Sequence, residues 1–151
     1  MKKLICCLLV CLLLPALALA APQPLTMQGL SKVVADHKGQ VVVVNFFATW
    51  CPPCREELPH LVKLAKEYQG KVVFVGLSVD EDASVVPPFL KKMGITYPVY
   101  LPQEDLIRSF GVRTIPHNVV YGPDGVMQAN QPGYVDGESL KAFIDSLLEH
   151  K

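Results

Sequence analysis

The chain has 151 residues, of which 50% are apolar and 19% are charged, with 14 basic and 14 acidic side chains. This neutral balance argues against nucleic acid or an anionic membrane surface as the main partner. The length suffices for one domain with a packed core, and we expect a monomeric protein.

The first 20 residues have the pattern of a secretory signal peptide. Lys2 and Lys3 precede the apolar run 4–14, and the small residues of segment 18–20 supply a cleavage site. The run is shorter than the roughly 20 residues of a comfortable membrane-spanning helix. We therefore expect a cleaved signal and a periplasmic or otherwise extracytoplasmic domain over residues 21–151, with a net charge of about −2. The alternatives are an uncleaved N-terminal membrane anchor and cleavage two residues earlier.

Removal of the signal changes how the five cysteines are interpreted, because it leaves fewer of them in the mature chain. Cys6, Cys7 and Cys11 belong to the apolar run, so the mature chain keeps only Cys51 and Cys54. The loop between these two is too small for a disulfide to stabilise the fold much. In an extracytoplasmic protein such a pair indicates redox chemistry or metal binding.

The first half of the mature chain predicts four regular elements. A helix is expected over residues 30–37, and the continuous, β-branched run 41–47 predicts a strand that is buried on both faces. Apolar residues at helical spacing predict a helix from the cysteines to about residue 69, with a kink at Pro59. Residues 72–79 predict a second buried strand.

The second half predicts shorter elements of both kinds. In chain order these are a helix from Pro87 to Met93, a strand over 97–101, a helix over 103–110, two strands over 118–121 and 126–129, and a helix over 137–149 capped by Asp136. Gly122-Pro123-Asp124-Gly125 between the two late strands is a strong hairpin signal. The alternation of elements predicts an α/β fold with a mixed central sheet and helices on both faces.

The segment Trp50-Cys51-Pro52-Pro53-Cys54 stands between a predicted strand and a predicted helix. The two sulfurs then lie in the first turn of the helix, close enough to form a disulfide. Free N–H groups and the helix dipole favour the thiolate at a helix N-terminus. In an open α/β sheet, chemistry is placed at the carboxyl ends of the strands, which is where this pair lies.

From about Gln40 to the C-terminus, the chain resembles the thioredoxin superfamily and its extracytoplasmic TlpA/ResA-like branch. The resemblance rests on the segment from Val44 to Pro59, on Gly111-Val112-Arg113-Thr114-Ile115-Pro116 and on the hairpin with Pro123-Asp124-Gly125. It implies a thioredoxin fold and a thiol-disulfide oxidoreductase without a cofactor or a bound metal ion.

The resemblance also implies roles for particular residues. Cys51 is implied as the attacking thiol, Cys54 as the buried resolving thiol, and Pro116 as a cis-proline beside the disulfide. The residues expected to contact the substrate are those around this pair: Trp50, Pro52, Pro53, Ile115 and His117. His117 directly after the cis-proline is unusual, and the alternative is a polar residue that only begins a strand.

One position departs from the cytoplasmic thioredoxins, which carry a buried aspartate six residues before the first cysteine. Here that residue is Asn45, which cannot take a proton. The resemblance to ResA-like proteins implies an acid after the second strand, with Glu81 as the nearest candidate for acid/base function and Asp80 as the second. The alternative is that both are solvated loop acids.

The residues between the cysteines bear on the direction of electron flow. With Cys51 at the helix cap, N–H groups of the second and third helical residues donate to the cap, and Pro53 has none. Thioredoxin, with a proline at this position, has a potential of about −270 mV, against about −120 mV for the oxidant DsbA. We therefore predict a reductant of protein disulfides.

The resemblance further implies partners for such a reductant. These are a membrane thiol donor of the DsbD/CcdA type and, among substrates, apocytochrome c in cytochrome c maturation. Two alternative functions stay open. One is a disulfide oxidase or isomerase of the same fold, and the other is a Cu(I)-binding chaperone that uses both thiols and His117.

Overall fold

A computed structural model describes residues 21–149, and the predicted signal peptide lies outside the described residues. The strands are β1 (Pro24–Leu25), β2 (Val41–Phe47), β3 (Val72–Ser78), β4 (Val99–Pro102), β5 (His117–Tyr121) and β6 (Met127–Pro132). The helices are α1 (Met27–Asp36), α2 (Pro52–Glu67), the 3₁₀ turn η1 (Ala83–Val85), α3 (Val86–Met93), α4 (Glu104–Ser109) and α5 (Gly137–Glu149). Within this range, no helix is long and apolar enough to cross a membrane.

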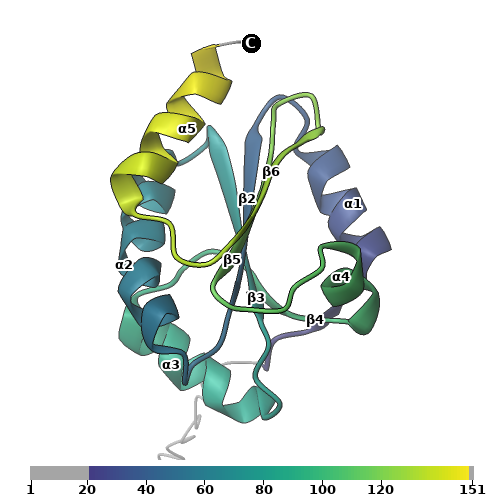
Figure 1. Ribbon diagram of the computed structural model, residues 1–151, viewed down its shortest axis with the longest axis vertical. Coiled ribbons are helices and arrows are strands. Elements are labelled where there is room, and N and C mark those ends of the chain that lie inside the picture. The colour runs from purple at the N-terminus through teal and green to yellow at the C-terminus, as the bar shows by residue number, and fades with distance from the viewer. Residues whose placement is uncertain (1–20, 150–151) are drawn as a thin grey trace, which may run out of the picture.

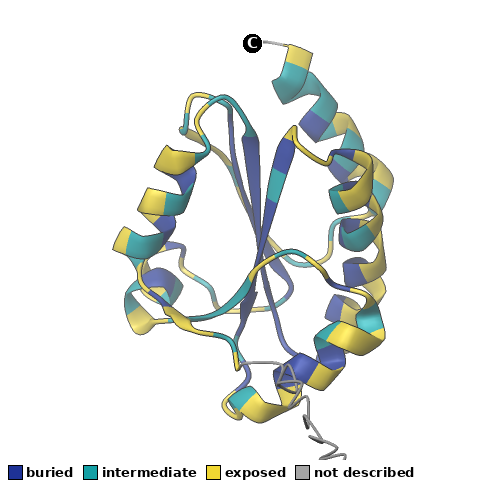
Figure 2. Ribbon diagram, turned by 180° about the vertical axis from the view of Figure 1, so that it is seen from behind, coloured by how far each residue is buried: buried dark blue, intermediate teal, exposed yellow. Residues whose placement is uncertain are grey.

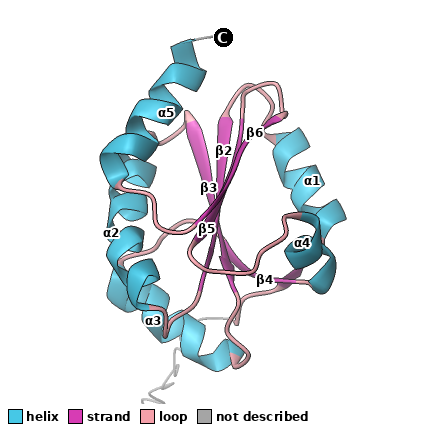
Figure 3. Ribbon diagram, viewed as in Figure 1, coloured by secondary structure: helices cyan, strands magenta, loops and turns pink. Residues whose placement is uncertain are grey.

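The strands form one six-stranded sheet in the order β1-β4-β3-β2-β5-β6 (Figures 1 and 3). Strands β1 to β4 pair in parallel, while β5 pairs antiparallel with both β2 and β6. This confirms the predicted mixed sheet. The hairpin is also confirmed, although its second strand starts one residue later and continues to Pro132.

Helices cover both faces of the sheet, as predicted. Helices α2, α3 and α5 lie on one side and α1 and α4 on the other (Figure 1). Each side has its own cluster of buried apolar residues, and the cluster beneath α2 includes both cysteines. Every residue of β2 is buried, because this central strand contacts helices on both faces (Figure 2).

The N-terminal segment differs most from the prediction. Helix α1 starts three residues earlier than expected, because the Thr26 side chain accepts a hydrogen bond from the Gly29 N–H at 3.1 Å and caps the helix. The expected irregular leader pairs with β4 through β1. Helix α2 is continuous through Pro59 and ends at Glu67.

Gly76 in β3 lies close to side chains of the neighbouring strands. It pairs with Asn45 of β2. A Cβ at this position would lie 2.9 Å from Val99 Cγ2 and 3.2 Å from Phe47 Cε1. The absence of a side chain therefore allows these neighbours to pack over β3.

The far end of α2 is held to α5 by polar contacts. The Tyr68 hydroxyl, just after α2, donates to an oxygen of Asp145 and accepts a hydrogen bond from Lys141 Nζ at 2.7 Å. Lys141 Nζ also lies 2.7 Å from Glu67 Oε1. These contacts join the last turn of α2 to the middle of α5.

Candidate active site

The two cysteines form a disulfide at the start of α2. Cys51 is the N-cap residue and Cys54 lies in the first turn, with Pro52 and Pro53 between them. Cys51 Sγ accepts a hydrogen bond from the Cys54 N–H at 3.2 Å. Both cysteines are buried, whereas Pro52 and Pro53 are exposed. The helix thus presents the pair at its positive end, with a single N–H directed at Cys51 Sγ.

The segment before β5 lies against this disulfide. The Ile115–Pro116 peptide bond is cis, in agreement with the expectation. The Ile115 carbonyl oxygen lies 3.8 Å from Cys51 Sγ. The Gly133 N–H donates to the Pro116 carbonyl at 2.8 Å, so the chain after β6 holds this segment in place.

Trp50 is the most exposed large apolar residue described, with 65% of its surface accessible. Together with Val85, Asp80 and Glu81 it lines an open groove of ≈ 460 Å³ beside the cysteines. Exposed aromatic surface next to a redox pair offers a contact for a protein substrate.

The two acids that were predicted after the second strand lie in different environments. Asp80 is buried, and its carboxylate accepts hydrogen bonds from Thr49 and Ser78. Glu81 is exposed, and its carboxylate forms no hydrogen bond or ion pair with the residues described. A role for Glu81 in acid/base chemistry stays a prediction.

His117 does not join the cysteines. Neighbouring residues of a strand face opposite sides of the sheet, and Asn118 faces α2. His117 faces the other side, where its ring lies 5.8 Å from that of Phe46, and Nε2 contacts Asn130 Oδ1 at 2.5 Å. The imidazole is thus placed away from the disulfide, although the His117 backbone follows the cis-proline.

One functional candidate was missed in the sequence: Glu57, which is fully buried on the inner face of α2. Its Oε1 accepts hydrogen bonds from Asn118 Nδ2 and from the Val135 N–H, each at 2.8 Å. Its Oε2 accepts one from Asn45 Nδ2, also at 2.8 Å. This carboxyl group, three residues after Cys54, connects α2, β2, β5 and the loop after β6.

Burial raises the pKa of Glu57, since the charged form loses its hydration, and the hydrogen bonds from Val135, Asn118 and Asn45 oppose this shift only in part. Burial also raises the pKa of Tyr97, and the charge of Glu57 adds to that effect. Neither the Tyr97 hydroxyl nor Asn45 Oδ1 has a partner among the described residues. The interior beneath the cysteines is therefore polar and can hold a proton on Glu57.

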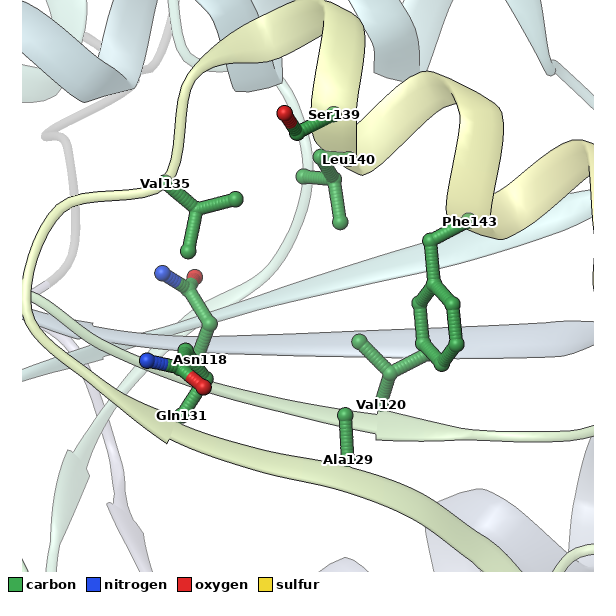
Figure 4. Close-up of a pocket in the computed structure, with 8 residues that line it drawn as sticks. All are labelled: Asn118, Val120, Ala129, Gln131, Val135, Ser139, Leu140 and Phe143. Atoms are coloured by element: carbon green, nitrogen blue, oxygen red, sulfur yellow. The ribbon is translucent and has the colours of Figure 1, made fainter.

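A small pocket of ≈ 200 Å³ lies between α5 and the β5–β6 hairpin (Figure 4). Val120, Ala129 and Phe143 give it an apolar end. At the other end lie Asn118 and Val135, the two residues that bind Glu57 Oε1. The pocket thus borders the hydrogen bonds of the buried carboxyl group.

The sheet with helices on both faces, and a disulfide at the N-terminus of a helix after a central strand, define a thiol-disulfide oxidoreductase of the thioredoxin fold. The chain belongs to the AhpC/TSA family, which it matches over residues 15–130.

Named relatives agree with this class. The chain is 29% identical over 123 residues to the thioredoxin-like protein YneN of Bacillus subtilis, covering 80% of this chain and 72% of that one. It is 27% identical over 123 residues to the thiol-disulfide oxidoreductase ResA of Geobacillus thermodenitrificans, covering 80% and 71%. Among solved structures, a thiol:disulfide interchange protein of the thioredoxin family from Chlorobium tepidum is 34% identical, with a TM-score of 0.70 over 76% of this chain and 83% of that one.

Proposed function

We propose that the protein reduces disulfide bonds of extracytoplasmic proteins. In the first step, the Cys51 thiolate attacks one sulfur of a substrate disulfide, and the other substrate sulfur leaves as a thiolate. In the second step, Cys54, as a thiolate, attacks Cys51 Sγ and releases the remaining substrate sulfur. Two electrons pass from the Cys51–Cys54 dithiol to the substrate, and the protein ends as the disulfide.

The observation that carries the reducing direction is the composition of the helix cap. Among residues 21–149, only the Cys54 N–H donates to Cys51 Sγ, because Pro52 and Pro53 lack backbone donors. The guanidinium of Arg55, four residues after Cys51, donates through Nε to the Thr49 carbonyl at 2.7 Å. A thiolate with few donors is weakly stabilised, and weak stabilisation of the reduced form makes a reductant.

The missing hydrogen bond changes the reduction potential by a limited amount. One charge-assisted hydrogen bond contributes about 1.5–3 kcal/mol, which corresponds to roughly 30–60 mV for a two-electron couple. This shift supports a potential on the thioredoxin side of the range between thioredoxin and DsbA, which spans about 150 mV.

The surroundings of the two cysteines support the assignment of their roles. Cys51 keeps 2% of its surface accessible and follows Trp50, which is 65% exposed, whereas Cys54 is completely buried. A substrate therefore approaches Cys51, with Trp50, Pro53 and the Ile115–Pro116 segment around it. The buried Glu57 carboxylate is suited to accept the proton of the Cys54 thiol.

An extracytoplasmic reductant needs a source of electrons. We propose a membrane thiol donor of the DsbD/CcdA type, and apocytochrome c as one substrate whose cysteines must be reduced for haem attachment. The N-terminal signal pattern supports the extracytoplasmic location, with a membrane anchor as the alternative.

The Cu(I) alternative uses the two thiols, with His117 as a candidate third ligand. His117 lies on the other side of the sheet, and no group of three metal-binding side chains is found among residues 21–149. Stoichiometric Cu(I) binding by the reduced protein that is lost in His117→Ala would support this alternative over the reductase.

The reducing direction is tested by equilibrating the protein with glutathione buffers and following the Cys51–Cys54 pair. We expect a potential well below that of DsbA, in the range of thioredoxin and the glutaredoxins, about −200 to −270 mV. A value above about −150 mV would identify an oxidase or isomerase instead.

A further inference from the structure

Thr49, two residues before Cys51, has all of its polar groups engaged in hydrogen bonds. Its N–H lies 3.0 and 3.2 Å from the two carboxylate oxygens of Asp80. Its hydroxyl donates to Asp80 Oδ1 at 2.7 Å, and its carbonyl accepts a hydrogen bond from Arg55 Nε at 2.7 Å. Thr49 is thus held from both sides, and the residue that follows is Trp50.

Asp80 extends the pairing of β2 and β3 beyond their last residues. The ladder ends with Phe47 opposite Ser78 and with the Val79 N–H donating to the Phe47 carbonyl at 2.8 Å. The Asp80 side chain then binds the N–H of Thr49, two residues after the end of β2. The Ser78 hydroxyl donates to Asp80 Oδ2 at 2.7 Å and fixes the carboxylate from its own strand.

The carbonyl of Thr49 is held by α2, whose Arg55 side chain in turn lies against α3. The Arg55 guanidinium, which binds the Thr49 carbonyl, lies 5.8 Å from the centre of the Phe89 ring. The Phe89 ring in turn stacks on Phe47, the last residue of β2, with 6.1 Å between ring centres. Thr49, which precedes the exposed Trp50, is thus held by Asp80 after β3 and by Arg55 of α2.

We propose that Asp80, acting through Thr49, is a positioning residue for the nucleophile. It fixes the peptide that carries Trp50 and Cys51, so that Cys51 Sγ stays between the Cys54 N–H and the Ile115 carbonyl. All donors around the carboxylate are hydroxyl or N–H groups of Thr49 and Ser78, and together they occupy both oxygens. The inference rests on the proposed role of Cys51 as the attacking thiol.

The experiment measures the reactivity of Cys51 alone, in a Cys54→Ser background, with the disulfide reagent DTNB between pH 5 and pH 10. The plateau of the rate at high pH reports how well the thiolate is presented, and the inflection reports the pKa of the thiol. In this background we compare Asp80→Asn, Thr49→Val and Thr49→Ser. Thr49→Val removes the hydroxyl donor at nearly constant volume. Thr49→Ser keeps the hydroxyl donor.

We expect the plateau to fall at least about tenfold in Asp80→Asn and about threefold in Thr49→Val, because small displacements of a reacting atom cost large factors in rate. The plateau of Thr49→Ser should stay within about twofold of the parent.

Asp82→Asn is the matched control, since it removes a negative charge from the same loop without touching Thr49. Its plateau should also stay within about twofold. Trp50, the single tryptophan, should show lower fluorescence anisotropy in the two impaired variants.

A plateau that is unchanged in both Asp80→Asn and Thr49→Val would overturn the inference. It would also be overturned if Asp80→Asn moved only the inflection, because that result would assign to Asp80 an effect of charge alone. If Asp80→Asn does not fold, the pair Thr49→Val and Thr49→Ser decides by itself. A parent protein that does not react with DTNB would reject the role of Cys51 and with it the proposed function, whereas a reactive parent with unchanged variants rejects only the positioning role.

Discussion

Asn45 on the central strand donates its side-chain N–H to Oε2 of Glu57 on helix α2, at 2.8 Å. The neutral amide thus occupies the position where cytoplasmic thioredoxins carry a buried aspartate, and a carboxyl group from the helix lies against it. The same amide also donates to Asn118 Oδ1 at 2.9 Å, so three side chains on two strands and a helix share one network. The buried acid of this site is supplied by α2 instead of β2.

The first prediction concerns the pH dependence of stability. Burial raises the pKa of Glu57 in the folded protein above its unfolded value, so its contribution to stability is complete below the unfolded value of about 4.3. That contribution is lost as the pH rises through the raised, folded pKa. In Glu57→Gln this dependence is absent. The free energy of unfolding of the wild type, relative to that of the variant, should therefore decrease from pH 4 upward.

Urea unfolding at several pH values, with the reduced and the oxidised protein measured separately, checks this dependence. Glu56→Gln, at the exposed neighbouring position, is the matched control and should leave the pH profile as it is. A constant difference between wild type and Glu57→Gln across the range would contradict a raised pKa.

The second prediction concerns the helix cap. Pro53→Ala restores the N–H of the second helical residue, which can donate to Cys51 Sγ beside that of Cys54. We expect the potential to become less negative by roughly 30–60 mV, the equivalent of one charge-assisted hydrogen bond. Pro53→His should shift it further in the same direction, because an imidazolium adds a positive charge near the thiolate.

Redox equilibria with glutathione, read by Trp50 fluorescence, measure these shifts. Pro52→Ala serves as the comparison, since the N–H of the first helical residue does not donate to the cap side chain. Equal potentials for wild type and Pro53→Ala would show that the number of donors does not set the potential.

The third prediction concerns the two thiols in the cell. A Cys54→Ser variant should accumulate mixed disulfides through Cys51, because the step that resolves them is removed. Non-reducing gels of periplasmic extracts would show adducts that disappear on treatment with dithiothreitol. The partners identified by mass spectrometry would name the substrate and the electron donor. The matched variant Cys51→Ser should trap none, and equal trapping by both variants would argue against Cys51 as the attacking thiol.

The fourth prediction concerns the packing of β3. Gly76→Ala places a methyl group 2.9 Å from Val99 Cγ2, and overpacking of this kind costs about 1–3 kcal/mol. Denaturant unfolding measures the loss. Adding Val99→Ala removes the atom in conflict, so the double variant should be less destabilised than the sum of the single ones. Strict additivity would show that the contact does not limit the packing.

Several features of the fold follow directly from the sequence. The apolar run of β2 predicted its bounds and its burial on both faces, and the Gly-rich turn predicted the hairpin between β5 and β6. The start of α1 was placed at Leu30 because the apolar pattern begins there, whereas the structure starts the helix at the cap of Thr26. Short pairing such as that of β1 depends on a distant strand, which no local pattern reveals.

The candidate site was predicted only in part. The cysteines were predicted from the contiguous segment 50–54, and the cis-proline from the resemblance of the separate segment 111–116. Glu57 was overlooked because helices carry many solvated acids, although it lies at positions i+3 from Cys54 and i−4 from Leu61, on the buried face. A charged residue on an otherwise apolar helix face was the signal available. Its partners Asn118 and Val135 are 61 and 78 residues away, so only the folded chain identifies them.

Helix α2 is fixed to the rest of the fold near both ends: through the hydrogen bonds of Glu57 near its start, and through Glu67, Tyr68 and Lys141 at its end. None of these contacts involves a cysteine side chain, so we expect them to stay in place when the disulfide opens and closes. The two redox forms should therefore superimpose over nearly the whole helix, and the strain of each catalytic cycle should be confined to the single turn that contains Cys51 and Cys54. A partner that distinguishes the reduced from the oxidised protein would then have to recognise the shape of that turn and of Trp50 beside it.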